Sequence, residues 1–474
     1  MRRFSTRAEI IRSHATSLTD FVDCCVCEGG CYYDYEPHLL EGDGRLALLV
    51  SHSLGLDGAP IVLLHAAYVL KRMGLRVLLA SPKDGPLRSE AKLRGVAVLV
   101  APLLKRPELV LNAGNFASFV MANTIETSAV VSALNGTDVP VLWWVHEAEA
   151  CYSSRRVSLL PYVLFPNVTV LAGGPYARRS LLKRRPSYQV GELLYALPDR
   201  AAQTTHGHDE VPQAAGLAHG HTKRKTFALI GMLEPRKGQD ILLAAIRRLP
   251  RNVKDACRFV FVGSAWNQRV AKAVYAAAAK SPELVSCVGT IPYKDLPAVY
   301  ESIECLICAS RDEPMSTTAS EACMFSDLVI CSDGAGMSEL LRSYDAGLVF
   351  GNGNADELAA SISRVCGAAD GEFDGMRARA RKLYESCFAE EVFERNMRRL
   401  IGQMVDHPVE IDAEQRKIAD ELREQARELA IAERHAYWMN DAPLWARPLY
   451  AATRWALLRF VLPVRHRLMA GHDL

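Results

Sequence analysis

Two glutamates with a fixed spacing, Glu313 and Glu321, are the side chains best placed to do chemistry in this sequence. They follow the apolar run 303–309, which predicts a buried parallel strand, and residues 317–325 predict the helix after it. Glu313 then lies in the loop at the carboxyl end of the strand, where open α/β sheets bind ligands. Glu321 lies within the helix, up to about 12 Å away. Carboxylates at that separation can hold hydroxyl groups at both ends of a long polar ligand.

The start of the predicted helix adds an anion-binding feature between the two carboxylates. The first backbone N–H groups of a helix have no partner within it, and they attract anions. Sugar hydroxyls, a diphosphate and ribose hydroxyls follow one another in a nucleotide sugar, so the arrangement indicates a site for such a ligand. Two solvated glutamates beside an ordinary helix are the alternative, because this spacing is common by chance.

Two regions of similar size, residues 45–198 and 226–405, predict the same architecture. In each region apolar runs that predict strands alternate with helical patterns, which is typical of a doubly wound parallel sheet. The expected strands are 46–51, 76–80, 96–100, 119–122, 139–145, 168–172, 227–230, 259–262, 284–288, 305–308, 328–331 and 348–350. The expected helices include 59–73, 87–94, 126–134, 239–248, 269–279 and 295–302. Two Rossmann-like domains of this kind place the ligand site in the cleft between them.

Residues 1–44 and 199–225 lie outside the two regions. The first segment predicts a small loop-rich extension, and the second, which is polar, predicts a linker or a long surface loop. Each holds residues of metal-binding type. The C-x2-C-x3-C spacing of the extension resembles part of a metal site, but no second C-x2-C pair follows it, and the linker histidines fit a solvated segment better, so a metal is the less favoured interpretation of both. These residues are Cys24, Cys25, Cys27 and Cys31 in the extension, and His206, His208, His219 and His221 in the linker.

The last segment, residues 406–474, predicts a helical tail. Residues 412–438 are charged, and residues 445–469 mix aromatic side chains with arginines. That mixture suits an interfacial helix at an anionic membrane surface. Packing of the tail on the rest of the chain, or on a partner, explains it equally well.

The composition excludes several other classes of protein. The chain has 474 residues, of which 49% are hydrophobic and 23% charged, and its net charge of +2 gives no electrostatic reason to bind nucleic acid. It shows neither an apolar stretch long enough to span a membrane nor the apolar core of a secretory signal. The 13 cysteines, an odd number, include several in apolar runs and favour a reducing compartment. We therefore expect a cytoplasmic protein.

Two loops at the ends of predicted strands are rich in glycine or in cations. Residues 51–60 contain Gly55 and Gly58, which permit tight turns and a close approach of the backbone to a ligand. Residues 231–240 contain Arg236 and Lys237, which would place positive charge beside the diphosphate proposed for the Glu313 loop. A plain strand–helix connection and solvated basic residues are the alternatives.

Together these segments resemble the retaining group 1 glycosyltransferases, of the GT4 type and the GT-B fold, from about residue 45 to 404. Residues 234–238 and the Glu313–Glu321 pair resemble that family's donor-site elements. Residues 334–339 are similar to its glycine-containing loop, and residues 194–199 to its crossover between domains. Residues 51–60, 81–87 and 143–147 are similar to segments of members that build bacterial polysaccharides. Each motif is short, but their order and their places at strand–helix junctions are specific.

The resemblance implies roles for individual residues. Arg236 and Lys237 would contact the donor diphosphate, Glu313 would hold sugar hydroxyls, and Glu321 would hold the ribose. The other donor-binding residues that we expect are Gly58, Gly231, Ile291, Met315, Ser316 and Thr317, and the expected catalytic residues are His146, Lys237 and Glu313. His146 matches a position near the reacting sugar, although a packed histidine at a strand end is the simpler alternative. No metal site and no cofactor are expected, since cations of the chain and a helix dipole meet the phosphate charge.

The implied activity is transfer of a sugar from a nucleotide diphosphate sugar to an acceptor hydroxyl, with retention. The acceptor would be a glycan or a lipid-linked molecule of a surface polysaccharide or glycolipid, and peripheral membrane contact of the tail would fit it. Two positions depart from the family pattern: Met232 stands where Arg is usual, and Ser316 where Gly is usual. A non-catalytic GT-B binding or scaffold subunit is therefore the alternative. A dehydrogenase is disfavoured, because Gly334-x-Gly336 carries Glu339 in the sixth place of G-x-G-x-x-G.

Overall fold

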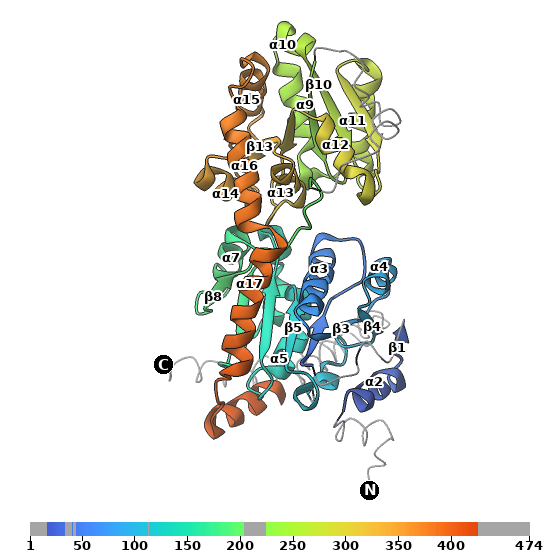
Figure 1. Cartoon of the computed structure of the whole chain (residues 1–474), viewed down its shortest axis with the longest axis vertical. Helices are drawn as coiled ribbons and strands as arrows, with labels where there is room; N and C mark the ends of the chain where they lie inside the picture. The colour runs from blue at the N-terminus through green and yellow to red at the C-terminus, as the bar shows by residue number, and fades with distance from the viewer. Residues whose placement is uncertain (1–16, 34–39, 41–43, 112, 203–223, 425–474) are drawn as a thin grey trace, which may run out of the picture.

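The computed structural model describes residues 17–33, 40, 44–111, 113–202 and 224–424. They form two α/β domains stacked end to end, the N-terminal domain at the bottom of Figure 1 and the C-terminal domain at the top. The predictions for the histidines of residues 199–225 and for the membrane-type segment 445–469 concern residues outside these ranges. No helix in the described ranges is long and apolar enough to cross a membrane.

The N-terminal domain is built on an eight-stranded sheet of order β1-β4-β3-β2-β5-β6-β7-β8. All neighbouring strands are parallel except β1 and β4, which are antiparallel. Central strands such as β2, β5 and β6 are buried at every position, as expected for a sheet covered on both faces. The strands are β1 Cys31–Tyr33, β2 Leu46–Val50, β3 Arg76–Ser81, β4 Ala97–Val100, β5 Phe119–Asn123, β6 Val141–Val145, β7 Val168–Ala172 and β8 Val190–Glu192.

The helices of this domain connect those strands. They are α2 Leu18–Cys27, α3 Gly58–Arg72, α4 Leu87–Leu93, α5 Ser128–Leu134, α6 Ser154–Leu159 and α7 Pro175–Leu182. A short 3₁₀ turn, η5 Glu149–Cys151, follows β6. The apolar runs thus predicted the main strands and helices, whereas α6, α7 and the three-residue strand β8 were not expected.

The prediction of a loop-rich N-terminal extension was wrong for residues 18–33. The Ser17 hydroxyl accepts a hydrogen bond from the backbone N–H of Asp20, the Asp20 carboxylate accepts one from the backbone N–H of Ser17, and this capping box starts α2. Cys24 and Cys25 are buried in the domain core, whereas Cys27 and Cys31 are exposed. Across the described parts of the chain, no group of three or more His, Cys, Asp or Glu side chains could hold a metal ion.

The C-terminal domain is built on a six-stranded parallel sheet of order β11-β10-β9-β12-β13-β14. Its strands are β9 Lys225–Ile230, β10 Cys257–Val262, β11 Val285–Gly289, β12 Cys305–Cys308, β13 Leu328–Ser332 and β14 Leu348–Phe350. Its helices are α9 Gln239–Arg248, α10 Arg251–Ala256, α11 Gln268–Lys280, α12 Leu296–Ser302, α13 Thr317–Met324, α14 Met337–Tyr344, α15 Ala355–Gly367 and α16 Asp374–Cys387. β9 and β12 are neighbours, so their C-terminal loops meet at the middle of the sheet edge.

The chain crosses between the domains twice. The first crossing, residues 193–202, leads from β8 to the C-terminal domain. The second leads from α16 to α17 Glu390–Ile401, which returns to lie beside α3 (Figure 1). There Phe393 packs on Trp144 at 5.8 Å between ring centroids, and Arg72 forms an ion pair of 2.7 Å with Glu390. Residues of both domains consequently share one continuous apolar core.

The first residues of the predicted tail also belong to the folded body. Ile411 and Ala419 are buried against Phe165 of the N-terminal domain, and Arg416 forms an ion pair with Asp138. In this part of the tail, up to residue 424, packing on the rest of the chain is therefore what the structure shows.

Candidate active site

The carboxylate of Glu313 is the centre of a compact charged cluster at the carboxyl ends of β9 and β12. The Lys237 Nζ and the Arg236 Nη1 each lie 2.7 Å from its Oε2 atom, and the Ser310 hydroxyl lies at 3.3 Å. All three donors bond the same oxygen, and among the described residues no hydrogen bond is seen to the second oxygen, Oε1. The structure thus brings together Glu313, Lys237 and Arg236, which were predicted as site residues from two loops far apart in the sequence.

A glycine brings these two loops into contact. Gly238 has a left-handed φ of 73°, and a Cβ atom there would lie 2.0 Å from the backbone oxygen of Ala309. Only glycine allows this approach, which places the cations before Gly238 beside the loop after β12. Gly231, the other predicted glycine of this loop, directly follows β9 and lies next to the side chain of Lys237.

The backbone of Glu313 is held by the glycine-containing loop that the sequence analysis singled out. Its N–H donates to the oxygen of Gly334 at 3.1 Å, and its oxygen accepts from the N–H of Gly336 at 2.8 Å. Three loops, after β9, β12 and β13, therefore fix the position of one carboxylate. Such support is what a binding group needs to keep its geometry.

Charge determines the protonation state of Glu313. Burial by itself would raise its pKa, but the positive charges of Lys237 and Arg236 outweigh burial and lower the pKa below the ordinary value. Glu313 is therefore ionised at neutral pH. An ionised carboxylate accepts hydrogen bonds from hydroxyl groups.

The N-terminus of α13 follows directly and offers N–H groups to an anion. Ser316 is the N-cap, with its hydroxyl accepting from the N–H of Ala319 at 3.3 Å, and Thr317 is the first helical residue. Met315 is buried just before it. The predicted phosphate-binding residues Met315, Ser316 and Thr317 thus lie at a helix start beside the Lys237 and Arg236 cations, as phosphate binding requires.

Glu321 lies inside α13 with 3% of its surface exposed. Its Oε1 atom accepts from the Arg200 guanidinium at 2.8 Å, and its Oε2 atom accepts from the Tyr300 hydroxyl at 2.6 Å. Burial raises the pKa of Glu321, although the charge of Arg200 opposes this. Both oxygens therefore already have partners, and a ribose would share them with Arg200 and Tyr300.

Arg200 is a site residue that the sequence analysis did not find. Its guanidinium lies 4.0 Å from the ring centroid of Tyr293, and it donates to the Tyr293 backbone oxygen at 2.7 Å. Tyr293 follows the predicted donor-binding residue Ile291, which is half-buried after β11. Arg200 belongs to the interdomain crossing, and no local spacing indicated that this crossing reaches Glu321.

In the N-terminal domain, His146 follows β6. Its ring lies 4.4 Å from that of Trp144, and its Nε2 atom is buried without a hydrogen-bond partner in the described residues. Burial, and secondarily the charge of His52, lowers the pKa of His146 to about 3. His146 is therefore neutral at physiological pH, and its enclosed Nε2 atom fits the packed histidine that was the simpler alternative as well as a binding role.

Glu147 holds the loop that carries His146. Its two carboxylate oxygens accept from the backbone N–H groups of Ile125 and His146, each at 2.9 Å. Burial raises the pKa of Glu147 to about 7. Glu147 belongs to the family-like segment 143–147, from which no role for it was predicted.

Gly58, predicted to bind the donor, is the first residue of α3. A Cβ atom there would meet no atom of the described chain within 4 Å. Packing therefore does not require glycine at this position, and the predicted donor-binding role of Gly58 stays a prediction. By contrast, a Cβ at Gly85 would lie 2.2 Å from the oxygen of Leu54, so the loops after β2 and β3 pack tightly together.

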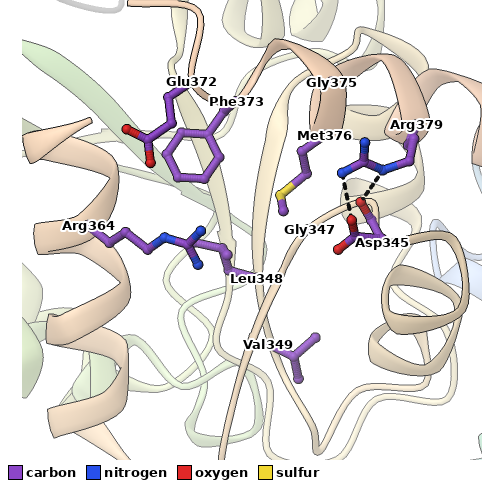
Figure 2. A pocket seen from close by; sticks show the side chains of 10 residues that line it. All are labelled: Asp345, Gly347, Leu348, Val349, Arg364, Glu372, Phe373, Gly375, Met376 and Arg379. Carbon is purple, nitrogen blue, oxygen red and sulfur yellow. Dashed lines mark hydrogen bonds and ion pairs between the residues drawn. The ribbon is translucent and has the colours of Figure 1, made fainter. Parts of the chain in front are cut away.

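A separate pocket of about 400 Å³ lies in the C-terminal domain between β14, α15 and α16 (Figure 2). Its lining includes Arg364, Phe373 and the ion pair of Asp345 with Arg379. None of the predicted site residues lines it.

Sequence and structure comparisons agree with this architecture. Residues 218–374 match the family of glycosyl transferases group 1, and residues 43–166 match glycosyl-transferase family 4. The chain belongs to the group 1 glycosyltransferases, as its motifs predicted, and it is a transferase with the GT-B fold. No curated protein sequence matches it.

Several solved structures share the fold. HepE of Anabaena, with UDP and glucose bound, is 18% identical, with a TM-score of 0.63 over 75% of this chain and 99% of that one. A glycosyltransferase from Rickettsia africae is 15% identical, with a TM-score of 0.62 over 77% and 100% of the two chains. Sucrose-phosphate synthase from Thermosynechococcus elongatus is 16% identical, with a TM-score of 0.61 over 76% and 99%.

Proposed function

We propose that this protein transfers a sugar, with retention of configuration, from a nucleotide diphosphate sugar to an acceptor hydroxyl. The observation that carries the proposal is the cluster of Glu313 with Lys237 and Arg236 at the N-terminus of α13. Its carboxylate can accept hydrogen bonds from the sugar hydroxyls of a nucleotide sugar. Its two cations and the helix dipole can meet the negative charge of the phosphates. UDP is the first nucleotide to test, because HepE, which shares the fold, binds UDP-glucose.

The side chains divide the reaction between them. Glu313 holds sugar hydroxyls, and Lys237, Arg236 and the helix start stabilise the negative charge that develops on the diphosphate. The bond between the anomeric carbon and the phosphate oxygen breaks, and the acceptor oxygen bonds that carbon on the same face. The departing phosphate oxygen takes the acceptor proton. The neutral His146 positions a hydroxyl group through Nε2, and no metal takes part.

The acceptor is proposed from the sequence resemblance alone. Members with similar N-terminal segments build polysaccharides, so a glycan or a lipid-linked acceptor is the expected class. Peripheral contact with the inner face of a membrane, through residues 445–469, and a cytoplasmic location belong to the same proposal.

A second function rests on Met232. This side chain is 37% exposed at the end of β9, where the family usually has Arg, so one phosphate cation is missing. A chain without it could bind nucleotide sugars as a non-catalytic subunit of a glycan-assembly complex. Against this, Arg236 lies beside Glu313 and supplies a second cation next to Lys237.

Incubation of the purified protein with UDP-, GDP-, ADP- and dTDP-sugars, with assay of slow nucleotide diphosphate release, tests the proposal. We expect release from one donor, loss of release in Glu321→Ala, and no change in Asp345→Asn, which alters the separate pocket. Thermal stabilisation by one nucleotide without any release, in the presence of glycan acceptors, would favour the binding subunit. Neither release nor stabilisation would overturn both functions.

A further inference from the structure

Asp312, next to Glu313, contacts the N-terminal domain directly. Its Oδ1 atom accepts from the N–H of Glu149 at 3.1 Å and from the Tyr176 hydroxyl at 2.7 Å. Its Oδ2 atom accepts from the N–H of Ala150 at 2.7 Å. One carboxylate of the donor loop thus has three donors, all in the other domain. Hydrogen bonds to an ionised carboxylate are shorter and stronger than neutral ones.

The surfaces around this contact are shaped for a close approach. A Cβ atom at Gly174 would lie 2.6 Å from the Cε of Met315, and one at Gly336 would lie 2.9 Å from the Cβ of Tyr176. Glycines on both sides therefore let the start of α7 lie directly against the donor loop. Nearby, Arg179 of α7 forms an ion pair with Glu339 of α14.

The contact connects the two groups that the proposed reaction needs to face each other. On one side Asp312 is followed by Glu313. On the other side its partners begin η5, two residues after Glu147, whose carboxylate holds the backbone of His146. A change in the position of Asp312 therefore changes the separation of Glu313 and His146.

We propose that Asp312 is a positioning residue, which holds the two domains together so that the His146 loop faces the sugar bound by Glu313. Its effect on catalysis rests on the proposed function, whereas its effect on the domain arrangement does not. Asp312 acts through the backbone of residues 149–150 and through Tyr176, and it touches no reacting atom.

Three variants test this inference. In Asp312→Asn one carboxylate oxygen becomes an NH₂ group, which cannot accept from a backbone N–H, and Tyr176→Phe removes a single donor. Asp345→Asn is the matched control, because it makes the same substitution at an ion pair within the C-terminal domain. Circular dichroism shows whether each variant folds. If Asp312→Asn does not fold, Tyr176→Phe still tests the inference.

Small-angle X-ray scattering without substrate measures the domain arrangement. We expect a larger radius of gyration for Asp312→Asn, a smaller increase for Tyr176→Phe, and none for Asp345→Asn. Equal radii for all four proteins would overturn the inference. This measurement decides the domain contact even if the wild-type protein has no transferase activity, in which case the proposed function alone fails.

Kinetics then separate a positioning role from a structural one. We expect kcat for sugar transfer to fall roughly 100-fold in Asp312→Asn, the size of effect caused by a misplacement of about 1 Å, with the Kd for free nucleotide unchanged. A weakened nucleotide affinity would show that the donor site itself is damaged. An open arrangement with normal kcat would show that the contact does not position the reacting groups. Either result would contradict the catalytic part of the inference.

Discussion

The two domains differ in how their proposed site residues are charged. In the C-terminal domain, Lys237 and Arg236 keep Glu313 ionised although it is buried. In the N-terminal domain, burial lowers the pKa of His146 to about 3 and raises that of Glu147 to about 7. The Glu313 cluster is therefore built from ionised groups, whereas burial favours the neutral forms of His146 and Glu147. The difference suits a reaction in which the donor carries phosphates while the acceptor is a neutral hydroxyl.

The largest effect should come from the Glu313 cluster. Lys237→Ala removes a cation that stabilises the leaving diphosphate, so we expect kcat/KM to fall about 100- to 1000-fold, the usual effect of losing one group that stabilises a transition-state charge. Lys237→Arg should recover part of the activity because it keeps the charge. Steady-state kinetics with the donor found active would check both. A loss below tenfold would show that the charges of this cluster act on structure rather than on the reaction.

The next effect concerns stability in the N-terminal domain. The pKa of Glu147 in the folded protein, about 7, lies above its ordinary value of 4.5, so the protonated form favours folding. The stabilisation that protonated Glu147 gives to the folded protein should be complete below pH 4.5 and should be lost as the pH rises to 7. The free energy of unfolding should fall by about 3 kcal/mol at most over this range. The thermal unfolding midpoints of the wild-type protein and Glu147→Gln, compared across this range, measure it. A difference between them that does not vary with pH would show that Glu147 titrates normally.

A smaller loss is expected at His146. Because this imidazole is neutral, His146→Ala should remove one hydrogen bond of about 1–2 kcal/mol and reduce kcat about 5- to 30-fold. Nucleotide affinity should not change, since the residue lies in the N-terminal domain. The pH dependence of kcat in the wild-type protein sharpens the comparison. A step near pH 6.5 that disappears in the variant would mean that His146 carries charge after all.

The smallest effect should come from the interior of α13. Tyr300→Phe removes the hydroxyl that lies 2.6 Å from Glu321, while Arg200 keeps its ion pair. We expect a decrease in nucleotide affinity of about fivefold, corresponding to about 1 kcal/mol for one hydrogen bond. Calorimetric titration with the free nucleotide would measure it. A decrease in kcat with unchanged nucleotide affinity would show that Glu321 acts in the reaction and not in nucleotide binding.

Local sequence patterns predicted the fold well where a segment is buried as a continuous strand. β2, β9 and β12 are such segments, and their apolar runs allow little else. The patterns failed for α2 and β1, because the cysteine-rich segment 24–31 resembles a metal site although two of its thiols are core residues. They also failed for α7, because this helix buries few apolar side chains and its arginines obscure the apolar pattern in the sequence.

The residues of the candidate site also divide into those that local sequence patterns could predict and those that they could not. Glu313 and Lys237 were predictable, because parallel strands bring their C-terminal loops to one edge of the sheet. Arg200 and Asp312 were not, because each acts across a boundary between elements that are far apart in the sequence. Arg200 reaches Glu321, 121 residues later, and Asp312 reaches Ala150, 162 residues earlier. Such contacts depend on how the two domains dock, which short-range spacing does not encode.

The return of α17 to the N-terminal domain has a consequence for biosynthesis. Trp144, in the centre of the first domain, packs on Phe393, and Gly136 lies against Ala419. On the ribosome the first domain is made long before these partners, so part of its apolar surface stays uncovered until residues 390–424 emerge. The C-terminal domain can complete its own sheet during that interval. The domain that is translated first therefore completes its packing only after most of the second domain has been made.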